Sequence, residues 1–206
     1  MTTYSKSRNQ VLVLLALGVL ATGAPRQGLA AEPAANPGTM AFAPGGTIRM
    51  KLNKGRIDVV GVSEDRITVS WRSTSVDDER DVKVKLERSG AKEASVSVDG
   101  PSEHTRYRIE VPRRSEVGIR MRAGELDVSG IDGSLDVELL AGELDLRLAE
   151  PRRYRSVAAS VLAGDLTARP WHADTSGLWR SFKFTGEGDY DLRARLLAGE
   201  LRIRGE

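Results

Sequence analysis

Cysteine is absent from this 206-residue chain, and histidine occurs only as His104 and His172. The absence of cysteine excludes disulfides, a thiol nucleophile and any metal site that uses cysteine. His-Glu-x-x-His, Gly-x-Ser-x-Gly and the Walker-type phosphate loop are also missing. Gly186-Glu-Gly188 lacks the third glycine of a dinucleotide site. We therefore expect no enzymatic activity, no cofactor and no bound metal.

A net charge of one sign is lacking once the N-terminus is set aside. Lys6, Arg8 and Arg26 are the only charged residues among positions 1–31, so removing these three from the 31 basic residues leaves 28, against 29 acidic ones. A nearly neutral domain has no net field to attract nucleic acid. Nucleic acid is therefore not an expected partner.

Long apolar runs are also scarce, and the longest, from Val11 to Ala21, follows Lys6 and Arg8. This run is short for a membrane span, and small residues follow it, as in a secretory signal peptide. We predict a signal peptide at 1–31 and export to the periplasm, cell surface or medium. An uncleaved anchor is the competing interpretation, which the Ala, Pro and Gly-rich stretch after it disfavours. Residues 32–46 are predicted to be a flexible spacer and 47–206 the folded domain, which is not expected to span a membrane.

Alternation of apolar and polar residues fills the folded part. Each apolar set at period two predicts a half-buried strand. These sets lie at 48–52, 57–59, 67–71, 82–86, 96–98, 107–111 and 117–121. No window beyond the leader has helical periodicity, so we predict an all-β domain.

A short phrase of glycine followed by polar, apolar, polar and apolar residues recurs in the chain. It begins at Gly124, Gly133, Gly142, Gly164 and Gly199. Successive hairpins would need Asn-Gly or Asp-Gly turns, and only Asp132-Gly133 fits among the first three phrases. We therefore favour a solenoid of short stacked strands, in which equivalent phrases lie in neighbouring coils.

Acidic residues recur with the phrase. Stacking predicts one row of Asp127, Asp136 and Asp145, and a second row of Glu125, Glu143, Asp165 and Glu200. Aligned carboxylates repel, so they must turn into solvent or bind cations such as calcium. We favour a solvated face, because the calcium-binding nonapeptide Gly-Gly-x-Gly-x-Asp is absent. Arginines such as Arg120, Arg122 and Arg147 are placed to neutralise part of the row.

Three segments together resemble the DUF4097 family of adhesin-like domains. They are Tyr107-Arg-Ile-Glu-Val-Pro112, the Gly124-Glu-Leu-Asp-Val-Ser-Gly130 phrase with its echoes, and the ending from Gly186-Glu-Gly188 through Leu192–Ile203. The resemblance covers the chain from about Thr47 to its end. It implies a single right-handed, β-solenoid-like "toast-rack" domain exposed in the bacterial envelope, and it supplies no catalytic residues.

One segment, between Arg169 and Asp189, departs from the repeat and holds two of the three tryptophans and two of the three phenylalanines. These aromatics either cap an end of the stack or form a recognition loop, and we favour the cap. If the segment binds a partner, we expect the contacts at Trp171, His172, Trp179 and Arg180.

Three functions are compatible with these features. We favour a non-enzymatic envelope or surface protein with a structural or binding role, whose partner is an envelope protein or a glycan. A module that senses envelope stress by binding a partner is the alternative. A carbohydrate-active β-helix enzyme is disfavoured, because such an enzyme needs a defined pair of carboxylates.

Overall fold

The computed structural model describes residues 36–101 and 104–206 of the chain. The signal peptide predicted for residues 1–31 lies outside these ranges. Most of the described residues belong to strands of one sheet, and the elements follow in the order β1 (Gly38–Ala41), β2 (Thr47–Val62), β3 (Arg66–Ser73), α1 (Val76–Arg80), β4 (Lys83–Gly90), β5 (Glu93–Asp99), β6 (Thr105–Pro112), β7 (Glu116–Ser129), β8 (Leu135–Leu148), η1 (Pro151–Arg153), β9 (Tyr154–Ala168), η2 (Arg169–Trp171), β10 (Ala173–Thr185) and β11 (Tyr190–Gly205). The all-β prediction is therefore confirmed.

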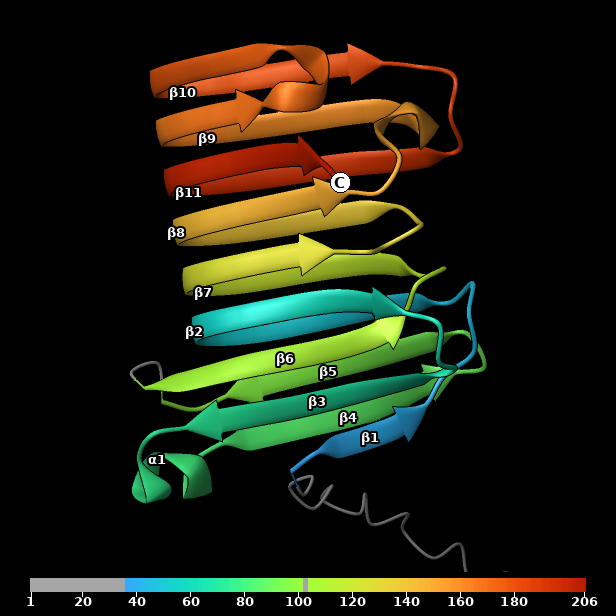
Figure 1. The fold of residues 1–206 in the computed structure, drawn as a ribbon, viewed down its shortest axis with the longest axis vertical. Helices are drawn as coiled ribbons and strands as arrows, with labels where there is room; N and C mark the ends of the chain where they lie inside the picture. The colour runs from blue at the N-terminus through green and yellow to red at the C-terminus, as the bar shows by residue number, and fades with distance from the viewer. Residues whose placement is uncertain (1–35, 102–103) are drawn as a thin grey trace, which may run out of the picture. The chain divides into compact units, whose positions relative to one another are not determined.

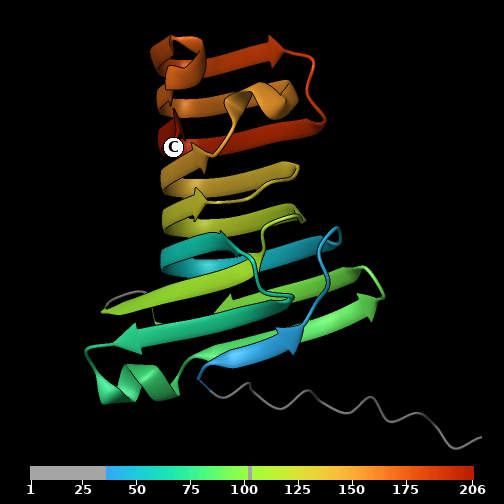
Figure 2. The same cartoon turned by 45° about the vertical axis from the view of Figure 1, so that its right-hand side comes forward.

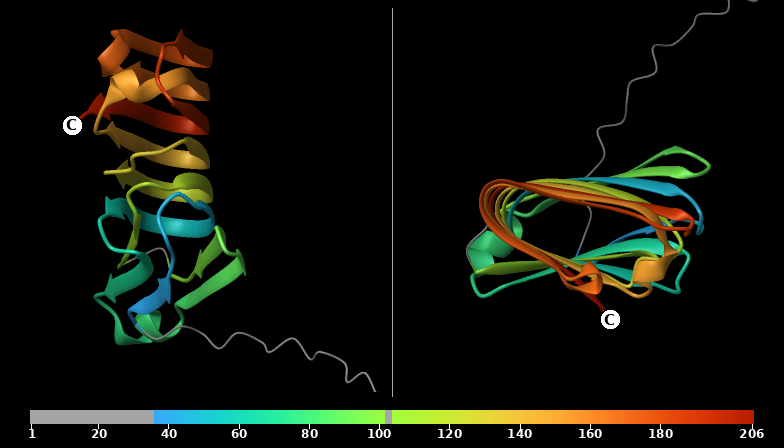
Figure 3. Two further views of the ribbon diagram at one scale, coloured as in Figure 1. Left: turned by 90° about the vertical axis from the view of Figure 1, so that its right-hand side faces the viewer. Right: turned by 90° about the horizontal axis from the view of Figure 1, so that it is seen from above.

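Six long strands form the main stack, in the spatial order β2-β7-β8-β11-β9-β10 (Figures 1 and 2). The first five run parallel and β10 is antiparallel to β9. Seen from above, each strand bends in the middle, so that its two short arms lie in opposite layers (Figure 3). One sheet thus folds over on itself, and its core lies between the arms.

Glycine occupies the bend of every strand in this stack. Gly124 lies beside Gly55 on one side and Gly142 on the other, and the line continues through Gly199, Gly164 and Gly177. Their φ angles lie between 114° and 136°, which other residues rarely adopt. A Cβ on Gly142 would also lie 1.9 Å from the carbonyl oxygen of Gly124. Both the backbone conformation and the stacking distance therefore require glycine.

The stack opens beyond β2. The first arm of β2, Thr47–Leu52, pairs with β5, whereas its second arm, Arg56–Val62, pairs with β6. β5 and β6 thus take the place of one bent strand, but they are separate strands joined through residues 100–104. β4 extends the layer of β5, and β3 and β1 extend the layer of β6.

The core follows the period-two pattern of the sequence. Inward-facing residues of neighbouring strands are fully buried and lie beside one another in register, as Ile119, Val137 and Ala194 do. The predicted apolar sets before Gly124 lie in strands, except that Val82 directly precedes β4, and nearly all of their members are buried. The alternation therefore identified the buried faces correctly.

Two expectations about the repeat are wrong. The Gly133 phrase does not stack with the others, because Gly133 precedes the first arm of β8, and Asp136 lies beside Gly118 and not beside Asp127. The unit that stacks runs from Gly124 to Gly142. Its length is twice the nine-residue spacing of the phrases, because one coil contains two arms. Spatial order also departs from chain order, since β11 inserts between β8 and β9.

Part of the stretch for which the sequence predicts a spacer is structured. β1, within residues 32–46, pairs with β3, and Phe42 is 1% exposed in the core. The sequence also gave no signal for α1, a single short turn that the Ser75 side chain caps by accepting a hydrogen bond from the Asp78 N–H at 3.4 Å. Its polar composition has no apolar periodicity.

We predict that Gly142→Ala lowers the free energy of unfolding by about 3 kcal/mol or more, because the new Cβ meets the Gly124 carbonyl and φ stays positive. Urea unfolding followed by circular dichroism measures this loss. Gly90→Ala is the control: its Cβ meets nothing within 4 Å, so a change within about 0.5 kcal/mol is expected. Equal losses in both variants would refute the corner argument.

Candidate functional site

The outward face of the second arms carries rows of acidic residues. Glu125, Glu143, Glu200 and Asp165 are neighbours in the register of β7, β8, β11 and β9, as the sequence predicts. In the next row Asp127 lies beside Asp145. Adjacent strands are about 4.8 Å apart, so these carboxylates would repel one another without compensation.

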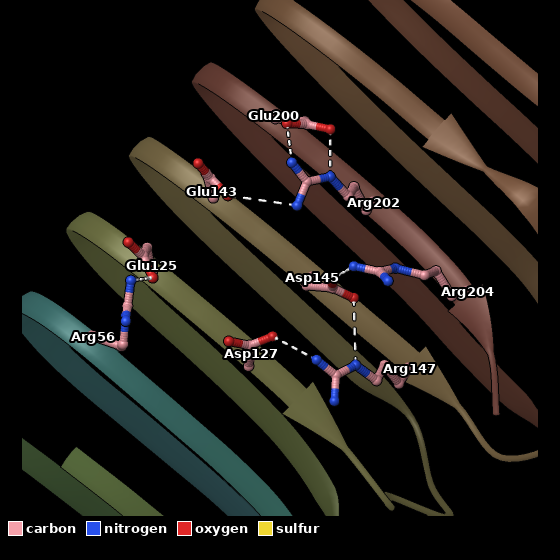
Figure 4. A network of polar contacts seen from close by, with 9 residues as sticks. All are labelled: Arg56, Glu125, Asp127, Glu143, Asp145, Arg147, Glu200, Arg202 and Arg204. Carbon is pink, nitrogen blue, oxygen red and sulfur yellow. Dashed lines mark hydrogen bonds and ion pairs between the residues drawn. The ribbon is translucent and has the colours of Figure 1, made fainter. Parts of the chain in front are cut away.

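Arginines from neighbouring strands provide that compensation (Figure 4). Arg147 on β8 donates to Asp127 on β7 at 3.2 Å, and its Nε lies 3.9 Å from Asp145. Arg204 on β11 pairs with the same Asp145 from the opposite side. The carboxylate of Asp145 is therefore held between two guanidinium groups.

The row nearest the corner is paired in the same way. Arg202 contacts Glu143 at 3.5 Å and pairs with Glu200 of its own strand, while Arg56 pairs with Glu125. The Arg56 guanidinium, mainly through its hydrogen bond, lowers the pKa of the Glu125 carboxyl. Each of these acids thus has a cationic neighbour.

The arginines bear on the calcium alternative for the acidic rows. Guanidinium groups lie where a cation between neighbouring carboxylates would lie, and Arg120 likewise donates to Asp136 at 2.7 Å. Among residues 36–101 and 104–206, no group of three or more His, Asp or Glu is placed to hold a metal ion. Apart from Asp165, which has no ion pair with a described residue, the acids of these rows form an ion-paired face.

The corner itself carries a different row. Leu140, Leu197 and Leu162 occupy equivalent positions, each between an inward-facing residue and the alanine that precedes the corner glycine. Trp179 of β10 takes the same place at the end of the row. Leu140 and Leu197 are 44% and 49% exposed, and Trp179 is 80% exposed. These four residues form an apolar row on the outside of the bend, which we call the corner row.

A shallow hollow of about 450 Å³ lies along the corner row. Its other wall is polar and comes from the outward face of the first arms, with Glu138, Arg195 and Arg180 among its residues. Arg195 lies 3.6 Å from Glu138, so this wall is itself ion-paired. An apolar strip beside a polar one is the composition of a protein-binding surface.

The structure separates the four residues that the sequence singles out. Trp171 ends η2 and packs against Phe182 and Phe184, with ring centroids 5.8 Å and 5.4 Å away. His172 follows with φ 56°, and its N–H donates to the Arg169 carbonyl at 3.1 Å. Trp171 thus belongs to an aromatic cluster that packs against the core at the end of the stack, whereas the His172 side chain is exposed.

Trp179 and Arg180 lie just after Gly177, the corner glycine of β10, and the first arm of this strand separates them from Trp171 and His172. Both border the hollow, and Trp179 has φ 56°, a conformation that is unusual for a bulky residue. Trp179 thus combines an unusual backbone conformation with high exposure.

The leucines of the corner row were missed from the sequence. Their signal is the pair of apolar residues before Ala-Gly, as in Leu139-Leu140-Ala141-Gly142 and Leu196-Leu197-Ala198-Gly199. The first residue of each pair faces the core and the second faces out. Period-two alternation alone does not indicate the second.

We predict that Arg204→Gln lowers the free energy of unfolding by about 2 kcal/mol, because it removes one of the two cations that hold Asp145, which is 7% exposed. Arg56→Gln is the matched control, since the side chains of its pair with Glu125 are 48% and 43% exposed and solvent screens them. Thermal and urea unfolding compare the two variants. A loss for Arg56→Gln as large as that for Arg204→Gln would contradict the argument from burial.

No protein-family model and no curated protein matches the chain. Membership of the DUF4097 family therefore stays a prediction. The described part of the chain contains no helix with the length and apolarity needed to cross a membrane.

Solved structures do resemble the chain. One, named a "putative cell adhesion protein", from Clostridium sporogenes, is 14% identical, with a TM-score of 0.51 over 85% of this chain and 100% of that chain. A second, named a "putative adhesin", from Parabacteroides merdae, is 9% identical, with a TM-score of 0.24 over 83% of this chain and 79% of its own. The likeness to the Clostridium sporogenes protein shows the fold.

Proposed function

We propose that this protein is an exported, non-enzymatic binding protein of the bacterial envelope or cell surface, and that it holds a protein partner at the corner row and the adjoining edge of β10. The observation that carries this proposal is the exposed apolar row, which ends in Trp179 beside Arg180. Tryptophan and arginine are enriched where binding energy is concentrated in protein interfaces. The name of the Clostridium sporogenes protein of similar fold supports an adhesive role.

The free edge of β10 favours a protein over a glycan as the partner. β10 pairs with β9 on one side, and no strand of the described residues pairs with its other side. Its 13 residues are nearly all exposed. An extended segment of a partner can add to such an edge through backbone hydrogen bonds while its apolar side chains lie on Leu178 and Trp179.

We predict that Trp179→Asn weakens partner binding roughly 30-fold, as expected for an exposed aromatic anchor that becomes buried when the partner binds. Asparagine tolerates positive φ, so this variant should unfold at the same temperature as wild type or above it. The purified chain is immobilised and exposed to envelope extract, the retained protein is identified by mass spectrometry, and its purified form is titrated by calorimetry.

The control is Arg122→Ala, which removes a large side chain from the equivalent position on β7, outside the apolar part of the corner. It should bind like wild type. Protease treatment of the extract should abolish retention, whereas glycan-degrading enzymes should not. Retention that survives protease, or equal binding by Trp179→Asn and wild type, would refute the proposal.

A further inference from the structure

A hollow of about 640 Å³ lies at a different place from the corner row. It lies beside the corner of β2, where the stack opens into the separate strands β5 and β6. Lys54 and Gly55 pair with Ala123 and Gly124 of β7, but in the described residues they have no strand partner on the other side. The hollow thus lies where the line of corners ends, beside backbone that has no described strand partner on that side.

Arginines line this gap in consecutive order. Arg56 of β2 lies directly beside Arg106 of β6, and Arg106 lies directly beside Arg72 of β3. Lys54 and His104 also border the hollow, and Glu125 is the only acid among its lining residues. The rows that continue across β7, β8 and β11 have acids as neighbours, such as Glu125, Glu143 and Glu200, whereas here three guanidinium groups are neighbours.

Like charges directly opposite each other on adjacent strands destabilise a sheet. Ion pairs within the chain offset the repulsion between these arginines only in part. Arg56 pairs with Glu125, and Arg106 Nε lies 3.7 Å from Asp58, but both arginine side chains are about half exposed. Arg72 has no ion pair with any described residue. The row therefore has unused capacity for anions, spaced about 4.8 Å apart along the strand order.

We propose that this hollow is a binding site for a polyanion that carries phosphate or sulfate groups, with Arg56, Arg72 and Arg106 as its contacts. Guanidinium groups present paired N–H donors that match tetrahedral oxyanions, and they remain charged at every physiological pH. Lys54 adds a further cation at the rim. A ligand with several anionic groups bridges neighbouring arginines and removes their mutual repulsion, which a single small anion does only in part.

The test measures binding of two probes by calorimetry at low ionic strength: inorganic tripolyphosphate and a sulfated tetrasaccharide. Arg72→Gln/Arg106→Gln should raise the Kd of the bound probe by about tenfold or more, since two charge-assisted contacts are lost. The control is Arg66→Gln/Arg114→Gln, which removes the same charge from exposed positions outside the hollow. It should bind like wild type.

A second measurement does not depend on the choice of probe. Without ligand at low salt, Arg72→Gln/Arg106→Gln should unfold at the same temperature as the control double variant or above it, because like-charge repulsion is relieved. Preference for one probe identifies the phosphate or the sulfate class. Failure of both probes to bind wild type, or equal binding by the two double variants, would overturn the proposal. Neither outcome affects the protein-binding proposal, because Trp179 takes no part in this site.

Discussion

A line of corner glycines is the constraint on which the rest of the structure depends. At each corner a long strand turns through φ angles above 110° without leaving the sheet. At four corners, Gly124, Gly142, Gly164 and Gly199, the carbonyl of the neighbouring glycine lies where a Cβ would lie. Only this arrangement lets both layers of the core come from the same strands. Where the line stops, beyond Gly55, the sheet divides into separate strands.

The shared corner also sets the chemistry of the surface. Because the arms of the stacked strands are in register on both sides of the glycines, each outward position becomes a row across the stack. A row of equal charges is unfavourable, and arginines from adjacent strands offset it at Asp127, Asp145 and Glu143. An apolar row needs no such partner. The corner row carries no charge, and Arg56, Arg106 and Arg72 form a row in which cations, and not acids, are neighbours.

Much of the fold could be predicted from the sequence, because period-two alternation determines which side chains face the core. What alternation does not reveal is which phrases are equivalent. Gly133 and Gly142 precede the same pattern, yet only Gly142 is a corner, because two arms separate successive corners. The insertion of β11 between β8 and β9 could not be predicted either, since its Gly199 phrase fits beside any other.

At the candidate site, composition located the aromatic segment but could not separate the packed Trp171 from the exposed Trp179. The two tryptophans differ because β10 bends at Gly177, which lies between them.

The two proposed sites lie on one continuously hydrogen-bonded stack. Five strand spacings, about 24 Å, separate Arg56 on β2 from Trp179 on β10 in the strand order, although the corner row begins closer to the arginines, at Leu140 on β8. Parallel strands in unbroken register, with glycine corners packed against one another, offer no hinge between the two sites. A ligand at one site therefore has no evident way to alter the other, and the two should bind independently. Taken together, the two proposals describe a rigid stack that would hold a protein and a polyanion at the same time.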